Sequence, residues 1–207
     1  MISHVNSTNI GRHEHAMDGM FKDRKRVFVD ILRWDVPVEG EYERDQFDNQ
    51  DAEYFIICDS GTGEHQASMR ILRTDRPHLL DSVFPMLCGN GVPNGPEYRE
   101  LTRLCVSPSL RARDRLRARN RLFTSLVEYA LLAGIKGYTG VSAMGVYSQV
   151  LALGWRCTPL GLPQMINGEV VAAVLAHIEP ETINLLRSAG TYDSGDIIVA
   201  DEFAKAA

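Results

Sequence analysis

The sequence predicts one α/β domain with a mixed, largely antiparallel sheet. Its 207 residues are 44% hydrophobic and 24% charged, which is typical of a folded globular domain and excludes a largely disordered chain. Short apolar segments that read as strands alternate with segments in which apolar residues recur every three to four positions, as in amphipathic helices. Two of the strands flank the turn sequence Asp59 to Gly63, which favours an antiparallel hairpin.

The first half of the chain is predicted to contain one helix and the hairpin. The helix ends before Pro37, because the residue before a proline is pushed out of helical geometry. The expected elements, in order, are a loosely ordered segment at 1–16, a helix at 17–34, an acid-rich loop at 38–52, and strands at 54–58 and 67–72.

The second half alternates between strands and helices. Ser107-Pro108 ends a strand, Gly134 ends a long helix, and Asn167-Gly168 forms a turn. The expected elements are an irregular connection at 75–97 with a helical piece at 79–87, strands at 100–106, 138–142, 155–160 and 169–176, and helices at 114–133, 143–153 and 180–189. We therefore expect a flexible N-terminus at 1–16, one domain at 17–190 and a tail at 191–207.

Composition narrows the class of protein. The formal net charge is −5, which argues against a dedicated nucleic-acid binder, yet 18 of the 22 cations are arginine because lysine occurs only four times. Arginine suits carboxylate and phosphate recognition. No stretch reaches the roughly 20 apolar residues of a membrane span, and the N-terminus lacks the apolar core of a secretory signal.

Cysteine and histidine spacing gives no metal motif. The four cysteines are far apart, so we expect buried free thiols in a reducing cytoplasm rather than disulfides or metal ligands. His13 and His15 flank Glu14 but lack the i, i+4 spacing of a helical zinc pair. The prediction is a cytoplasmic protein without a bound metal.

Several charged residues stand where burial is expected. Arg70 lies in an otherwise apolar strand, so it needs a partner. Arg24 and Phe28 share one helix face because they are four residues apart. Three carboxylates, at Glu43, Asp45 and Asp48, lie within six residues. The alternative is a solvated acidic loop that follows an ordinary helix.

Two further groups flank the long helix. Glu100 and Arg103 lie on opposite faces of a regular strand, unless a bulge changes their register. Six arginines then occur at alternate positions from Arg111 to Arg121. Together with the amides of a helix N-terminus they can receive an anion; the alternative is a solvated helix face.

These residues, in this order, resemble the acyl-homoserine lactone synthases, which make the autoinducers of bacterial quorum sensing. The resemblance runs from about residue 20 to 190. The matching motifs are Arg24…Phe28…Trp34…Glu43-x-Asp45-x-Phe47-Asp48, Met69-Arg70-Ile71-Leu72, Phe84-Pro85, Glu100-Leu101-Thr102-Arg103, Gly154-Trp155 and Pro159-Leu160-Gly161.

The resemblance implies an acetyltransferase-like (GNAT-type) fold, a three-layer α/β sandwich whose mixed, splayed sheet opens a cleft for the acyl donor. It also implies a reaction in which S-adenosylmethionine is acylated by acyl carrier protein or acyl-coenzyme A. The amine attacks the thioester, and the carboxylate then displaces methylthioadenosine to close the lactone. Both reactants are substrates, so no cofactor or metal is expected.

The resemblance also implies roles for individual residues. Glu100 is the candidate base, and Arg24 or Arg103 is expected to bind the carboxylate of S-adenosylmethionine. Phe28 and Trp34 are expected to face its sulfonium. The expected catalytic set is Glu100, Arg70, Asp45, Asp48, Glu43 and Arg103. The expected acyl pocket is Phe84, Phe123, Thr139 and Val141. The expected carrier or phosphopantetheine site is Arg111, Arg113, Arg115, Arg117 and Arg121.

One segment departs from the family pattern. Ala143 to Val146 lacks an arginine associated with that helix, which leaves the choice of acyl chain open. Two alternatives to the synthase remain. One is an ordinary GNAT-type N-acyltransferase that does not use S-adenosylmethionine, and the other is an inactive module that binds acyl carriers.

Overall fold

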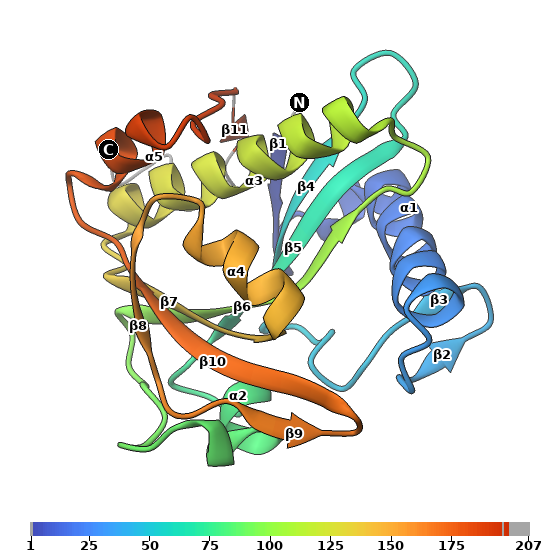
Figure 1. Ribbon diagram of the computed structural model, residues 1–207. Coiled ribbons are helices and arrows are strands. Elements are labelled where there is room, and N and C mark those ends of the chain that lie inside the picture. The colour runs from blue at the N-terminus through green and yellow to red at the C-terminus, as the bar shows by residue number, and fades with distance from the viewer. Residues whose placement is uncertain (1, 196, 199–207) are drawn as a thin grey trace. The chain divides into compact units, whose positions relative to one another are not determined.

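The computed structural model describes residues 2–195 and 197–198. Their contacts group them into two compact units, each built from separate stretches of chain. The first unit draws on Met1–Ile71, Arg103–Ser125 and Asp193–Ala207, and the second on Leu72–Thr102 and Leu126–Tyr192. Figure 1 gives the element labels used below. Each unit contains both helices and strands, and the two longest elements at the centre of the sequence, β6 and α3, contribute residues to both.

The first unit contains a sheet in the order β11–β1–β4–β5. Strand β4 pairs antiparallel with β1 and β5, whereas β11 runs parallel to β1. The predicted hairpin is confirmed, with Glu53 opposite Ile71 and a register shift at Ile57/Cys58. The strands are β1 (Ile2–Val5), β4 (Glu53–Cys58), β5 (His65–Arg73) and β11 (Ile197–Ile198).

The expectation of a loosely ordered segment at 1–16 is wrong for the residues described. Ile2 and Val5 have no solvent exposure, and β1 is followed by η1 (Ile10–Arg12) and the start of the first helix. The strand was missed because half of it is polar. His4 is nevertheless buried, since its Nε2 lies 2.7 Å from Glu53 Oε2.

The segment predicted as the first helix is helical, but it combines two types of helix. It consists of α1 (Glu14–Arg24) and a π-helical continuation, η2 (Lys25–Ile31). The Leu32 amide bonds the Val27 carbonyl five residues back, at 2.9 Å. Arg33 then adopts a φ of 60°, which ends the helix before Pro37. π-Helical turns are rare and occur frequently at functional sites.

The remaining elements of the first unit follow this helix. The acidic loop contains a short antiparallel hairpin of β2 (Val38–Glu39) and β3 (Tyr42–Glu43). The predicted long helix is confirmed as α3 (Ala112–Ala133), which ends at Gly134 with a φ of 69°. In Figure 1, α1 lies beside the hairpin formed by β2 and β3.

The second unit contains its own run of strands, β6–β7–β10–β8, with β9 also paired to β10. Strands β6 and β7 are parallel and the other pairs are antiparallel. Its strands are β6 (Tyr98–Val106, as far as Thr102), β7 (Gly137–Ala143), β8 (Arg156–Pro159), β9 (Gln164–Ile166) and β10 (Glu169–His177). Its helices are α2 (Leu79–Ser82), η3 (Pro85–Leu87), α4 (Met144–Leu151) and α5 (Thr182–Ser188).

Helix α4 covers part of this sheet, because Tyr147 packs with Ala172 and Val174 of β10. The predicted turn between β9 and β10 is confirmed, since Asn167 and Gly168 both have positive φ. Strand β9 itself was not predicted, because three residues are too few for a period to emerge. Each unit therefore has a mixed, mainly antiparallel sheet, as the sequence predicts for the α/β class.

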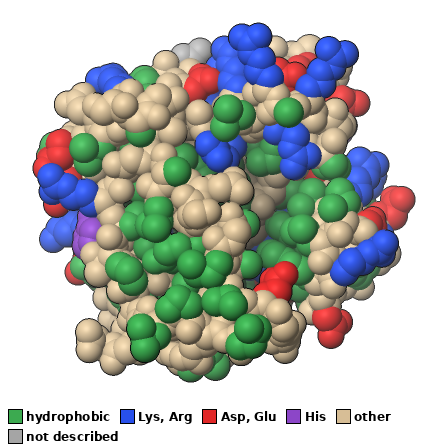
Figure 2. Space-filling view, in the orientation of Figure 1, with side chains coloured by type: hydrophobic (Ala, Val, Ile, Leu, Met, Phe, Trp, Pro, Cys, Tyr) green, Lys and Arg blue, Asp and Glu red, His purple; other side chains and the backbone are tan. Residues whose placement is uncertain are grey.

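Figure 2 shows hydrophobic side chains gathered over α4. Met144, Val146 and Leu151 are each about two-fifths exposed (40–43%). Among the residues described, no helix has both the length and the apolar character needed to cross a membrane.

Candidate active site

Three arginines and three carboxylates form one buried network in the first unit. They come from α1, the acidic loop, β5 and the second half of β6, which are far apart in sequence. Their formal charges sum to zero. The six residues are Arg24, Glu43, Asp45, Asp48, Arg70 and Arg103.

All three guanidinium nitrogens of Arg24 are hydrogen-bonded within this network. Its Nε donates to Glu43 Oε2 at 2.6 Å, and its Nη1 and Nη2 donate to the two oxygens of Asp48, both at 2.8 Å. Only 1% of the side chain is exposed. Bidentate pairs of this kind are the strong form of charge-assisted hydrogen bond, so Arg24 anchors the acidic loop to the end of α1.

Arg70 has the partners that its place in an apolar strand requires. It donates to both oxygens of Asp45, at 2.6 and 3.0 Å, and its Nη1 also lies 3.0 Å from Asp48 Oδ1. The Tyr54 hydroxyl donates to Asp48 at 2.9 Å. Tyr54 is a member of the site that the sequence did not single out, because an aromatic residue in a buried strand reads as core.

Arg103 completes the network through two of its three guanidinium nitrogens, Nε and Nη2. Its Nη2 donates to Glu43 Oε1 at 3.0 Å and to Asp45 Oδ2 at 2.6 Å, and its Nε donates to Glu43 at 3.1 Å. Its φ of 56° interrupts the regular strand geometry, so the alternation of faces that a regular strand would give does not hold at this position. The Nη1 group donates to none of the residues described, and 9% of the side chain is exposed.

The network keeps its groups ionised against the effect of burial. Burial raises the pKa of Asp48, but Arg24 and Arg70 outweigh it and hold that pKa well below its usual value. The same balance lowers the pKa of Asp45, with Arg70 as its main partner. Burial lowers the pKa of Arg24, but Asp48 and Glu43 raise it by a larger amount, so the pKa increases overall. The partners of Asp45, Asp48 and Arg24 thus more than offset the effect of burial on their charged forms.

An aromatic pair lies next to Arg103. Phe28, in η2, and Trp34 stack with ring centroids 4.9 Å apart and planes 6° apart. The Arg103 guanidinium lies 5.7 Å from the Phe28 centroid. Phe28 is 2% exposed and Trp34 is 38% exposed. The π-helical turn thus presents Trp34 to solvent and uses Phe28 to support it.

Glu100 belongs to the second unit, where it is held by backbone amides. Its Oε2 accepts from the Leu79 amide at 2.8 Å and its Oε1 from the Leu80 amide at 3.0 Å. The residue has no solvent exposure. The carboxyl group is therefore fixed at the start of α2 rather than free to rotate.

The predicted acyl-pocket residues are divided between the units. Phe84 and Val141 pack against the same apolar cluster in the second unit, around Leu80 and Leu87. Thr139 lies two residues before Val141 on β7, so the two share a strand face. Its hydroxyl is 3.5 Å from the Arg99 carbonyl. The fourth, Phe123, is buried in the first unit.

The arginine row lies at the start of α3. Figure 2 shows basic side chains along this part of the helix. Arg111, Arg113, Arg115 and Arg117 are exposed. Arg117 and Arg121 also pair with Asp193, each at 3.2 Å. Asp193 lies in the stretch expected to be a tail, so its contribution could not be read from the sequence.

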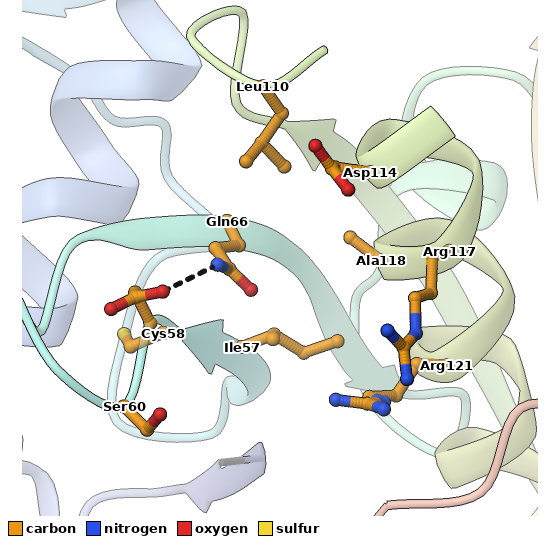
Figure 3. Close-up of a pocket in the computed structure, with 10 residues that line it drawn as sticks. Ile57, Cys58, Ser60, Gln66, Leu110, Asp114, Arg117, Ala118 and Arg121 are labelled. Atoms are coloured by element: carbon orange, nitrogen blue, oxygen red, sulfur yellow. Dashed lines mark hydrogen bonds between the residues drawn. The ribbon is translucent and has the colours of Figure 1, made fainter. Parts of the chain in front are cut away.

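Arg117 and Arg121 also line a cavity of about 460 Å³ in the first unit. In Figure 3 their guanidinium groups lie on its α3 side, opposite the ends of β4 and β5. Asp59, which accepts a hydrogen bond from Gln66 at 3.2 Å, and Asp114 also line it. The two carboxylates balance the two guanidinium groups, so this cavity is polar without being strongly cationic.

The structure offers no metal-binding arrangement within 2–195 and 197–198. No group of three or more His, Cys, Asp or Glu residues there has the geometry to hold a metal ion. The four cysteines are free thiols. Burial raises the pKa of Cys157 to about 11, which favours its unreactive thiol form.

Comparison with known proteins identifies the family. The autoinducer synthase family model matches residues 8–186. An acyl-homoserine-lactone synthase of Ralstonia nicotianae is 32% identical over 179 residues, which cover 83% of this chain and 87% of that protein.

Solved structures agree with this match. The CoA-dependent acyl-homoserine lactone synthase MesI is 28% identical, with a TM-score of 0.82 over 97% of this chain and 100% of that one. BjaI, solved with SAM and isopentyl-CoA, is 23% identical with a TM-score of 0.85 over 100% and 98% of the two chains, which supports the acetyltransferase-like fold. Sequence match, fold and site together show that this chain belongs to the autoinducer synthase family, the acyl-homoserine-lactone synthases, which are acyltransferases.

Proposed function

We propose that this protein makes N-acyl-homoserine lactones from S-adenosylmethionine and an acyl-coenzyme A. The observation that carries the proposal is the pairing of a charge-neutral buried network with one unsaturated guanidinium, Arg103, beside the Phe28–Trp34 stack. A carboxylate binder and an aromatic face for a cation are the two features that S-adenosylmethionine requires.

The geometry separates the roles of the two arginines that the sequence left open. All three nitrogens of Arg24 are already bonded to Glu43 or Asp48, so we assign it to holding the acidic loop. Arg103 keeps its Nη1 group for the substrate carboxylate. The exposed Trp34 ring is the surface for the sulfonium, while Phe28 supports it from below the surface. Glu43, Asp45, Asp48 and Arg70 then orient Arg103.

The reaction requires two bond-forming steps. The amine nitrogen of S-adenosylmethionine attacks the thioester carbonyl carbon, losing a proton to a base and expelling the thiolate, which takes up a proton. The carboxylate oxygen then attacks the carbon next to the sulfonium, and methylthioadenosine leaves as the lactone closes. Glu100, three residues before Arg103 on β6, remains our candidate base because it is a carboxylate that two backbone amides hold in a fixed position.

Coenzyme A is the donor that we favour. MesI, at 28% identity, is described as CoA-dependent. The exposed arginines at the start of α3 provide positive charge beside a helix N-terminus, which suits the phosphates of coenzyme A. We propose Phe84, Val141 and Thr139 for the acyl pocket; Phe123 stays a prediction. Free thiols favour a reducing, cytoplasmic setting.

The test is a direct product analysis. The purified protein is incubated with S-adenosylmethionine and either acyl-coenzyme A or acyl carrier protein, and mass spectrometry measures the lactone and methylthioadenosine. We expect both products in equal amounts, with coenzyme A thioesters as the faster donors. Acyl transfer to another amine without methylthioadenosine would instead identify an ordinary N-acyltransferase, and binding without turnover would identify an inactive module.

The role of Glu100 has its own test. Glu100→Gln should lower kcat by about 10²–10⁴-fold, the usual range for a general base, while S-adenosylmethionine still binds by calorimetry. The new amide group faces one backbone amide of α2, so the melting temperature is measured in parallel. Glu100→Asp is the matched variant that keeps the charge. Normal turnover in folded Glu100→Gln would remove this residue as the base.

A further inference from the structure

A second buried polar chain lies in the first unit, outside the network described above. Asp23 Oδ2 lies 2.8 Å from His65 Nδ1, and His65 Nε2 lies 2.9 Å from Ser68 Oγ. Asp23, His65 and Ser68 are 4%, 6% and 1% exposed. The spacing of residues in the sequence does not reveal these contacts, because Asp23 and His65 are 42 residues apart.

The order carboxylate–imidazole–hydroxyl is that of a nucleophilic triad, but burial excludes that role here. Ser68 lies within β5 and is 1% exposed, so no substrate can reach its hydroxyl. A carboxylate removed from water must instead be satisfied by fixed partners. This hydrogen-bonded series of side chains is therefore structural, and its function depends on which elements it connects.

The connection joins the elements that carry the network arginines. Asp23 is the neighbour of Arg24 at the end of α1, and His65 begins the strand that carries Arg70. Ser107, just after β6, is near enough to Asp23 for its hydroxyl to lower the pKa of that carboxyl group. Burial raises the pKa of Asp23, but hydrogen bonds from His65 and Ser107 outweigh it, for a net decrease. One carboxylate thus ties α1 to β5.

Packing holds the same junction closely. A Cβ on Gly19 of α1 would lie 3.2 Å from the Cβ of His65, so helix and strand approach closely there. Immediately after Asp23 and Arg24 the chain enters the π-helical turn that carries Phe28. A small displacement of this junction would move Arg24, Phe28 and Trp34 together.

We propose that the Asp23–His65 pair is a positioning element of the S-adenosylmethionine site, which fixes the α1–η2 junction against β5. The proposal rests on the function proposed above. His65 does not touch substrate; it acts through Asp23 on the segment that carries Arg24 and the aromatic stack. Because misplacement of a binding group by about 1 Å can cost up to 10²-fold, the effect is expected on S-adenosylmethionine and not on the acyl donor.

The chain offers a matched control. His4 is also a buried histidine of the first unit, paired with a carboxylate, Glu53, at 2.7 Å, but this carboxylate belongs to strand β4 and not to α1. His65→Leu and His4→Leu both remove an imidazole–carboxylate contact. We expect both to lower the melting temperature, but only His65→Leu to raise KM for S-adenosylmethionine, by about tenfold or more, with KM for the acyl donor unchanged.

A rescue variant addresses misfolding. The amide nitrogen of His65→Asn can take the place of Nδ1 and donate to Asp23, so this variant should recover most of the affinity for S-adenosylmethionine. Ser68→Ala, which removes only the partner of Nε2, should change KM by less than His65→Leu. An equal rise in KM for both substrates, or an equal effect of His65→Leu and His4→Leu, would overturn the proposal.

A spectroscopic readout separates this proposal from the proposed function. In a Trp155→Phe background, Trp34 is the remaining tryptophan of the two in the sequence. Iodide quenching of its fluorescence should change in His65→Leu and not in His4→Leu, with no substrate present. If the native protein fails to bind S-adenosylmethionine, the proposed function is wrong while this measurement still tests the positioning. Unchanged quenching in folded His65→Leu would refute the positioning role.

Discussion

The first unit uses arginine in two opposite ways. In the network, Arg24 and Arg70 are 1% exposed, and each holds one aspartate through two nitrogens. At the start of α3, Arg113 and Arg115 are exposed to solvent. The residue type is the same, but the first group is fixed and neutralised whereas the second is free to meet a diffusing anion.

This difference indicates which charges build the site and which attract a substrate. A buried ion pair is expensive to assemble and more expensive to break, because removal of one partner leaves an uncompensated charge. An exposed charge costs little to assemble and is screened by salt. Arg103 stands between the two groups, since it is part of the network and still has one donor group available.

The largest expected effect comes from breaking the buried group. Arg70→Met should lower the free energy of unfolding by about 3–5 kcal/mol, the usual cost of an orphaned buried charge, and should abolish lactone synthesis. Chemical denaturation and the product assay measure both. Arg73→Met, on the same strand, removes an exposed pair with Asp75 and should change stability by no more than about 1 kcal/mol. Similar losses for the two variants would contradict the comparison.

The next effect distinguishes Arg103 from Arg24. Arg103→Lys removes the forked donor but keeps the charge, so KM for S-adenosylmethionine should rise about 10–100-fold, as for loss of a charged hydrogen bond of about 1.5–3 kcal/mol. Its melting temperature should change less than that of Arg24→Lys, because Arg24 is bound on all three nitrogens. If Arg24→Lys instead raises KM with no loss of stability, the two assignments must be exchanged.

The sequence predicts the main elements of this fold well where a period is long enough to read. The α3 helix and the hairpin of β4 and β5 emerge from apolar spacing and turn residues. Strand β1 does not, because burial of His4 depends on Glu53 from another strand. The same limit applies to the π-helical form of η2, since spacing of three to four residues does not distinguish it from an α-helix.

The residues of the candidate site can likewise be divided into those that the sequence predicts and contacts that it does not. Family resemblance supplies the six network residues, but not the pairing of Arg24 with Asp48 and of Arg70 with Asp45, which depends on how distant segments fold together. The contacts of Asp23 with His65 and of Asp193 with the α3 arginines leave no local pattern. Long-range polar partners are therefore what the sequence conceals most completely.

A smaller effect is the loss of stability of the folded protein at low pH. The pKa of Asp48 is lower in the folded protein than its value of about 3.9 in an unfolded chain. Its contribution to stability is thus complete above the unfolded pKa and is lost as pH falls toward the folded pKa. Denaturation at pH 6, 4.5 and 3.5 should show little change in stability between the first two and a loss at pH 3.5, which lies below the unfolded pKa. Asp48→Asn should be less stable at pH 6 and lose less below pH 4.5; a parallel decline in both proteins would remove Asp48 as a source.

The smallest effect tests the exposed arginines. Replacing Arg113 and Arg115 together by glutamine should raise KM for acyl-coenzyme A only a few-fold at low salt, because exposed pairs contribute about 0.2–1 kcal/mol each. The difference should vanish near 1 M salt, where the Debye length is about 3 Å. Arg156→Gln with Arg187→Gln makes the same change of charge in the second unit and should leave KM unaltered. A salt-independent rise would mean that Arg113 or Arg115 makes a fixed, desolvated contact with the donor, and the contrast between the buried and the exposed arginines would then not hold.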